Sequence, residues 1–267
     1  MAEPSWRLDR EAVLARFVEA CSNDDRIAAA FLAGSFARGE SDEHSDLDLC
    51  VVVADDAFDQ VVGDRERLTA LLGDVLFLED FGNEALVFAI LADGTDIELH
   101  VARESELDQI RAGPHRVLVD DRGVLEGLTF PGSEHDRAVQ ASELRNVVTW
   151  FWHDLSHFAA AIDRHQLWWA AGQLEQLRGY CVRLARIEHG AEPMPDEPYW
   201  KLDAEMPTAS LEPLRSTFVP MERGAMLDAA RELLAFFRSR APEAAGAGGI
   251  TYPAALDRLA GERLGTP

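Results

Sequence analysis

Apolar and polar positions follow two different periods along the first half of the chain. Residues 9–22 place apolar side chains at helical spacing after an aspartate that can cap a helix, so we expect an amphipathic helix there. The run "RIAAAFLAGS" (26–35) is typical of a buried strand that ends in a glycine turn. After a charged loop, "DLDLCVVVA" (46–54) alternates and then turns continuously apolar, which favours a central strand, and residues 57–72 have a helical pattern.

Three more strands are predicted before residue 103. They are "VLFLED" (75–80), "EALVFAIL" (84–91) and "TDIELHVA" (95–102). The last two flank an Asp-Gly pair at residues 93–94, which is a strong signal for a β-hairpin between alternating runs. The natural assembly of these segments is a mixed sheet flanked by helices.

The second half of the chain has a helical pattern throughout. It is helical from residue 137 to 188 with a break at 163–165, and again over roughly 222–240. The run "APEAAGAGG" (241–249) is typical of a flexible linker before a short helical tail. The pattern therefore predicts an α+β protein of two domains: residues 1–130 with the mixed sheet, and residues 131–267 as an all-α helical bundle.

Charge narrows the classes of partner. The 267 residues carry a net charge of −23, and residues 1–130, with 11 basic and 29 acidic side chains, carry −18 of it. Such a surface repels a phosphate backbone and attracts a polycationic small molecule, so we expect no nucleic-acid partner. No apolar run approaches the ~20 residues of a membrane span. Three cysteines without C-x-x-C spacing favour reduced, buried thiols, and we expect a soluble cytoplasmic protein, with homodimerisation left open.

The strand that begins near residue 46 carries two aspartates on one face. Because residues i and i+2 of a strand point the same way, Asp46 and Asp48 project together while Leu47 and Leu49 point into the core. Two carboxylates so close repel each other unless a cation lies between them. Oxygen ligands of this kind suit Mg²⁺, which binds carboxylates together with substrate phosphates.

Other residues complete the candidate site. The turn at Gly34 and Ser35 offers backbone N–H groups and a hydroxyl to a phosphate, and Arg38 is a candidate phosphate clamp. A third carboxylate is expected from "TDIELHV", where Glu98 is our first choice and Asp96, on the same face, is the rival. The third carboxylate is expected to act as a base on the attacking hydroxyl or as a ligand to the metal beside it.

Together these residues resemble the polymerase-beta-like nucleotidyltransferase superfamily, whose signature is Gly-Ser, about ten residues, then Asp-x-Asp on a strand. Here it stands as Gly34-Ser35, ten residues, and Asp46-Leu47-Asp48. The length, the helical second half and the "ELHV" strand are most similar to the antibiotic nucleotidyltransferases that modify lincosamides or aminoglycosides.

The resemblance implies a function and a role for each domain. Residues 1–130 would be the catalytic domain, and residues 131–267 would cover substrate and nucleotide. The implied reaction is the transfer of AMP from ATP, with two Mg²⁺ ions held by Asp46, Asp48 and Glu98, to a hydroxyl of a small antibiotic, releasing pyrophosphate. The alternative is a minimal nucleotidyltransferase of the antitoxin type, a regulator of a partner protein whose "GSxARG…SDxDL" wording this chain also matches.

Three arginines and two histidines in the helical half are predicted to have structural roles. Arg178, Arg183 and Arg186 are expected on a solvated helix face, with contact of one of them to the triphosphate left open. His153 and His157 have the i, i+4 spacing of a helical metal pair, but "HDLSH" lacks the glutamate of the H-E-x-x-H motif, so the sequence does not predict a zinc site there.

Overall fold

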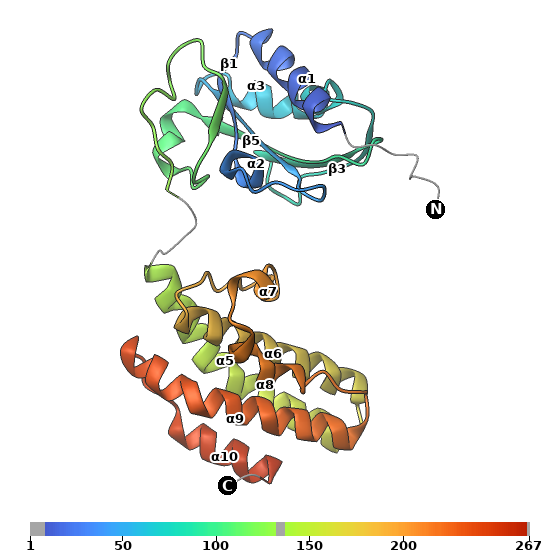
Figure 1. The fold of residues 1–267 in the computed structure, drawn as a ribbon, viewed down its shortest axis with the longest axis vertical. Coiled ribbons are helices and arrows are strands. Elements are labelled where there is room, and N and C mark those ends of the chain that lie inside the picture. Colours follow the sequence, from blue (N-terminus) through green and yellow to red (C-terminus); the bar gives the residue numbers. More distant parts are fainter. Residues whose placement is uncertain (1–8, 132–136, 266–267) are drawn as a thin grey trace. The chain divides into compact units, whose positions relative to one another are not determined.

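The structure, a computed structural model, describes residues 9–131 and 137–265 (Figure 1). Its contacts divide the chain into two compact units, Met1–Ser133 and Glu134–Pro267. The first unit contains the sheet and the second is helical, so the predicted α+β class is confirmed. Within the described ranges, no helix combines the length and apolarity that crossing a membrane requires.

A six-stranded mixed sheet forms the centre of the N-terminal unit. The strands are β1 (Ile27–Leu32), β2 (Leu47–Val53), β3 (Val75–Glu79), β4 (Leu86–Leu91), β5 (Asp96–Arg103) and β6 (Arg116–Val119). Their order is β3-β4-β5-β2-β1-β6, and in this sheet β2 and β5 pair in parallel while the other neighbours are antiparallel. Five strands match the predicted segments, including the β4–β5 hairpin. The short edge strand β6 was not predicted.

One face of this sheet is covered by helices. Helix α1 (Arg10–Ser22) begins as predicted, with Asp9 accepting a hydrogen bond from the Ala12 N–H at 3.0 Å. The helical pattern of residues 57–72 folds as two short helices, α3 (Phe58–Gly63) and α4 (Arg65–Ala70), rather than one. Val13 and Phe17 of α1 pack with the inward-facing side chains of β2, β4 and β5. This layer is the main core of the unit.

The opposite face is covered at one end only. Beyond β5, the 3₁₀ helix η1 (Glu104–Gln109) and the chain up to residue 130 place Leu107, Leu125 and Phe130 over Cys50 and Val52 of β2. The N-terminal ends of β2 and β5 lie outside this small core. They carry the candidate carboxylates on the same face of the sheet.

The helical unit packs around three long helices. It comprises α5 (Arg137–Asp163), α6 (Leu167–Glu188), α7 (Leu202–Glu205), α8 (Thr208–Arg215), α9 (Arg223–Ala247) and α10 (Ala254–Leu264). Helices α5, α6 and α9 contribute most of the core, and α10 packs on α5. The predicted break at 163–165 is confirmed by His165, which turns the chain with φ +57°. The three cysteines of the chain are buried and free, as expected.

The predicted linker at 241–249 is wrong, because α9 continues through Ala247. Pro242 removes one helical N–H donor, which normally weakens a helix interior. Ala241 and Ala245 lie one turn apart and are fully buried in the helical core. Packing of this small-residue face outweighs the tendency of proline and glycine to end a helix. The sequence pattern shows only that local tendency, so it predicts a linker.

Candidate active site

The connection from β1 to β2 brings Gly34 against Asp48. The Ala33 N–H donates a hydrogen bond to the Asp48 carbonyl at 2.8 Å, so the chain leaving β1 is fixed to the start of β2. The predicted Gly-Ser turn is the start of a five-residue helix, α2 (Gly34–Arg38), which Gly34 enters with φ +60°. A Cβ atom at Gly34 would lie 1.6 Å from Asp48 Oδ2. Only glycine allows the backbone to approach the carboxylate this closely.

The parallel ladder between β2 and β5 places two predicted acids side by side. Asp48 pairs with Glu98 in the register, and Leu47 and Leu49 on either side are buried, as the alternation predicts. Asp46 directly precedes β2 and is exposed. Asp96, the rival to Glu98, is exposed at the first position of β5, opposite Ile90 of β4. The structure therefore brings Glu98, among the two candidates, next to Asp48.

Burial and neighbouring charges shift the pKa values of Asp48 and Glu98. Burial and the charge of Asp46 raise the pKa of Asp48 to about 6, although the guanidinium of Arg38 acts in the opposite direction. Burial, followed by the charges of Asp48 and Asp46, also raises the pKa of Glu98. Each shift means that a negative charge at this face is disfavoured without a cation, which is the expected property of a carboxylate site built for metal ions.

Ser35 and Arg38 lie on the helix beside this carboxylate cluster. Within the described part of the chain, the Ser35 Oγ atom is buried and has no hydrogen-bond partner. A buried hydroxyl without a protein partner is available to bond to a ligand or to an ordered water. The Arg38 Nε atom donates to Glu40 at 2.8 Å in a partly exposed ion pair. Such a pair contributes little to stability, so the guanidinium can exchange partners at low cost.

The loop that joins α2 to β2 is held from two sides. Asp42 accepts hydrogen bonds from the His44 N–H at 2.9 Å and from the Ser45 hydroxyl at 3.1 Å, which closes a local turn. The Arg10 guanidinium of α1 donates to the Glu43 carbonyl at 2.8 Å. The loop therefore delivers Asp46 to the start of β2 from an anchored position.

Aromatic side chains next to Glu98 were missed by sequence reasoning. Phe88 of β4 pairs with Glu98 in the antiparallel register, and the Phe81 ring meets the Phe88 ring edge to face at 5.2 Å between centroids. Phe81 is 70% exposed. Phe88 lies in the apolar run of β4, which normally indicates core, so only the register of β4 against β5 reveals its place beside Glu98.

A family model identifies the class of protein to which this chain belongs. The family model described as streptomycin adenylyltransferase matches residues 9–262, which span both units. The chain belongs to the streptomycin adenylyltransferase family. This adenylyltransferase is an enzyme, a nucleotidyltransferase of the antibiotic-resistance type, which confirms the class inferred from the Gly-Ser and Asp-x-Asp signature.

Solved structures and curated proteins complete the comparison. An aminoglycoside 6-adenyltransferase from Bacillus subtilis aligns over 97% of this chain and 98% of its own, with 17% identity and a TM-score of 0.45. A nucleotidyltransferase-like protein from Exiguobacterium sibiricum 255-15 aligns over 86% of this chain and 74% of its own, with 11% identity and a TM-score of 0.46. No curated protein matches the sequence of this adenylyltransferase.

The close approach at Gly34 leads to a first prediction for this adenylyltransferase. In Gly34→Ala, the new methyl group must displace the Asp48 carboxylate. If Asp48 acts in catalysis, as the sequence predicts, its misplacement by about 1 Å can cost about 10²-fold in rate. We expect steady-state nucleotidyl transfer to fall by about that factor or more. Gly39→Ala is the matched control, because Gly39 has φ +72° but no atom within 4 Å of its added Cβ. Near-normal turnover by Gly34→Ala would contradict the close approach of Gly34 to a functional Asp48 carboxylate.

The raised pKa of Asp48 gives a second prediction, on stability without metal. Since its folded-state pKa of about 6 exceeds the 3.8 of an unperturbed aspartate, the folded protein binds more protons between these values, and its free energy of unfolding falls as pH rises from about 4 to 6. Asp48→Asn should remove this loss. We expect it to stabilise the protein in EDTA by about 1–2 kcal/mol above pH 6. A fully buried group would contribute ~1.4 kcal/mol for each unit of its pKa shift, and solvent screening of the partly exposed Asp48 lowers this value.

Urea denaturation at a series of pH values measures this effect. The stability difference between Asp48→Asn and the unaltered protein should be small at pH 4, grow to pH 6 and then level off. A difference that is independent of pH would contradict the carboxylate repulsion as its cause.

Proposed function

We propose that this enzyme transfers AMP from Mg²⁺-bound ATP to a hydroxyl group of an aminoglycoside antibiotic and releases pyrophosphate. The observation that carries the proposal is the pairing of Asp48 with Glu98 on one sheet face, with Asp46 and the partnerless Ser35 hydroxyl beside them, in a chain of the streptomycin adenylyltransferase family. The reaction breaks the bond between the α-phosphorus and the bridging oxygen of pyrophosphate. The acceptor oxygen forms the new bond and gives up its proton.

The residues present fit a divalent metal. Asp46, Asp48 and Glu98 are all-oxygen donors on one face, and the pKa values of Asp48 and Glu98 are raised, so the site gains a stable ionised state when a cation binds. We assign these three side chains to two Mg²⁺ ions. When bound, such ions neutralise phosphate charge and stabilise the attacking and leaving oxygens of an in-line displacement.

The chain's own groups bind and orient the nucleotide. The Ser35 hydroxyl, buried without a partner, donates to a phosphate oxygen, and the missing side chain at Gly34 leaves room beside Asp48. Arg38 leaves its exposed pairing with Glu40 to contact the phosphates, because a phosphate offers a stronger, charge-assisted hydrogen bond. These three positions were predicted from the sequence as nucleotide-binding residues and are proposed here in that role.

Glu98 is proposed as the third carboxylate in preference to Asp96. It pairs directly with Asp48 and responds to the charges of Asp48 and Asp46, whereas Asp96 lies exposed opposite Ile90. Its raised pKa favours proton uptake, which suits a group that accepts the proton of the attacking hydroxyl. Coordination of a metal ion is the other role open to it.

Charge and shape favour a polycationic acceptor over a singly charged lincosamide. The first 130 residues carry a net charge of −18, which attracts amino sugars over long range. Phe81 and Phe88 add an apolar surface beside Glu98 on which a sugar or cyclitol ring can rest. Because ATP is made and kept inside the cell and the proposed acceptor is a small antibiotic, we propose that the enzyme acts in the cytoplasm without a nucleic-acid or membrane partner.

The antitoxin-type alternative, a regulator that acts on a partner protein, receives less support. The family model that matches this chain extends over residues 9–262 and so includes the helical unit, which a minimal nucleotidyltransferase of the antitoxin type lacks. The motifs "GSxARG" and "SDxDL" are compatible with both hypotheses. A direct assay separates them.

The test of the proposed function is an acceptor panel. The enzyme is incubated with Mg²⁺, each of the four nucleoside triphosphates, and aminoglycosides or lincosamides in turn, and pyrophosphate is measured together with the mass of the acceptor. We expect pyrophosphate and an added AMP on an aminoglycoside with ATP, and neither with Asp46→Asn or Asp48→Asn. Modification of a lincosamide only, or of a protein only, would contradict the proposal.

A further prediction separates the two roles of Glu98. If Glu98 only accepts the proton, Glu98→Gln should lower turnover by about 10²- to 10⁴-fold while Mg²⁺-nucleotide affinity stays unchanged. If Glu98 holds metal, affinity and turnover should fall together and activity should depend more steeply on Mg²⁺ concentration. Single-turnover kinetics and nucleotide binding measure the two quantities.

Asp96→Asn is the matched control for this variant, because it alters the neighbouring acid on the same face of β5. We expect it to keep turnover within a few-fold of normal. Full activity of Glu98→Gln together with loss in Asp96→Asn would reverse the assignment within β5 and leave the roles of Asp46 and Asp48 intact.

A further inference from the structure

A second cluster of metal-ligating side chains lies in the helical unit, on α5. His153, Asp154 and His157 each offer one ligand atom, and these atoms all lie within 4.8 Å of one another. We infer that this cluster binds one zinc ion, in a site made entirely of residues from the helical unit. The inference does not rest on the proposed transfer reaction.

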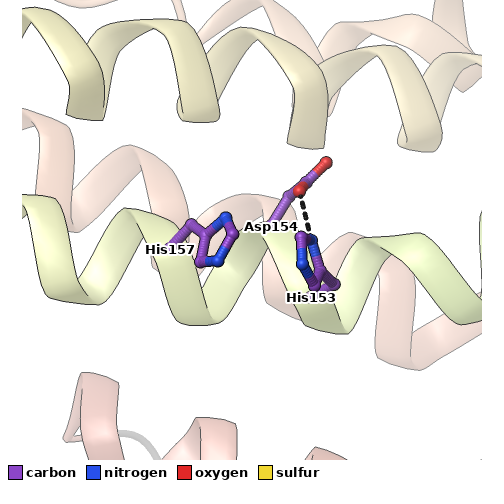
Figure 2. Close-up of side chains that lie close together, drawn as sticks. All are labelled: His153, Asp154 and His157. Carbon is purple, nitrogen blue, oxygen red and sulfur yellow. Dashed lines mark hydrogen bonds and ion pairs between the residues drawn. The ribbon is translucent and has the colours of Figure 1, made fainter.

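The helix geometry brings the three side chains together. His153 and His157 are one turn apart, and their ring centroids are separated by 4.1 Å. Asp154 is the next residue after His153, yet its Oδ1 atom lies 2.9 Å from His153 Nδ1. Figure 2 shows the two rings and the carboxylate next to one another on α5, with Asp154 extending toward the neighbouring helix.

Residues of α6 fix the cluster from outside. The Tyr180 hydroxyl donates to Asp154 Oδ2 at 2.8 Å, so one carboxylate oxygen is held by α6 and the other faces His153. The Trp169 ring lies 5.7 Å from the His157 ring. Partners of this kind orient metal ligands in known sites and reduce the entropy lost when the ion binds. The neighbouring Arg183, which lies over the Tyr180 ring, has its charge matched by Glu143 at 2.6 Å.

The donor set selects the metal. Two imidazole nitrogens and one carboxylate oxygen suit Zn²⁺, whereas Mg²⁺ and Ca²⁺ prefer oxygen ligands alone. Tetrahedral ligands at about 2.0–2.1 Å from zinc lie roughly 3.3 Å apart, so a modest rotation of the half-exposed histidines closes the present spacing. The His153 side chain is 50% exposed and that of Asp154 is 14% exposed, which leaves the fourth position open to water.

Zinc bound here would also stabilise the helical unit. The ion would join two ligands of α5 to a carboxylate that is hydrogen-bonded to α6, and it would bind the folded chain better than the unfolded chain. By mass action, the melting temperature then rises with zinc concentration. Magnesium should leave it unchanged through this site.

The test uses the full chain carrying Asp48→Asn, which weakens the separate carboxylate site of the N-terminal unit. Zinc binding is measured by isothermal titration and by competition with a chromogenic chelator, and melting is followed by circular dichroism. We expect one zinc equivalent and a higher melting temperature. His153→Gln and His157→Gln, added singly, should each weaken binding by roughly tenfold or more, and Asp154→Asn, which keeps an acceptor for Tyr180, by about tenfold.

The matched control is His165→Asn, in the exposed turn after α5, where asparagine tolerates the positive φ. It should bind zinc as tightly as its parent. Zinc binding that survives both histidine variants, or that is absent once Asp48 is changed, would overturn the inference. The same titrations on the chain with Asp48 intact must show the loss of one equivalent in His157→Gln, which keeps the test valid if Asp48→Asn folds poorly.

Discussion

Repulsion among carboxylates on one face of the sheet is the constraint around which the N-terminal unit is built. The ladder between β2 and β5 holds Asp48 beside Glu98, with Asp46 one residue before the strand. The opposite face of the same strands buries Leu47, Leu49, Ile97 and Leu99. Full burial of such side chains contributes about 1.5–3 kcal/mol each, so their sum exceeds the repulsion that one face imposes. Carboxylates can therefore be crowded on one face without unfolding the sheet.

Much of this fold is visible in the pattern of the chain. Helix α1, five of the six strands and the break between α5 and α6 follow from local periodicity and from residues that cap or interrupt helices. Where packing opposes local preference, the pattern gives the wrong answer. The α9 segment around Pro242 and the buried Arg178 and Arg186 are the clearest cases, and β6, only four residues long, leaves too short a pattern to detect.

The two arginines show why burial of charge is hard to predict. Arg186 was expected on a solvated face, but it is fully buried and donates to the Pro198 and Glu192 carbonyls at 3.1 Å and to Glu205 at 2.7 Å. Arg178 is buried against Thr217 in the same way. Arg178 also pairs with Glu175 on its own helix. The other partners lie 6 to 39 residues away, and most are backbone carbonyls that carry no sequence signal. A helix pattern cannot reveal them.

The residues of the candidate site also differ in how far local sequence predicts them. Gly34, Ser35, Asp46 and Asp48 belong to one short motif, so their spacing alone predicted a common site. Glu98 was placed on the correct face of its strand, but its preference over Asp96 depends on a register between segments fifty residues apart. Asp154 was overlooked for a related reason, because a residue at i+1 is not expected to join a helical pair at i and i+4.

The ladder between β2 and β5 also separates what must be kept in this chain from what can change. After Val53 the backbone makes a long excursion through α3, α4, β3 and β4 before it returns as β5. Adjacent strands lie about 4.8 Å apart whatever the length of chain that joins them. Insertions in the exposed turns of residues 54–85 thus leave the two acids as neighbours, whereas the helices of this excursion must be kept, because Val61, Val62 and Leu68 are buried in the main core. The turns of this excursion are where a designer could add a new module without moving the two acids apart.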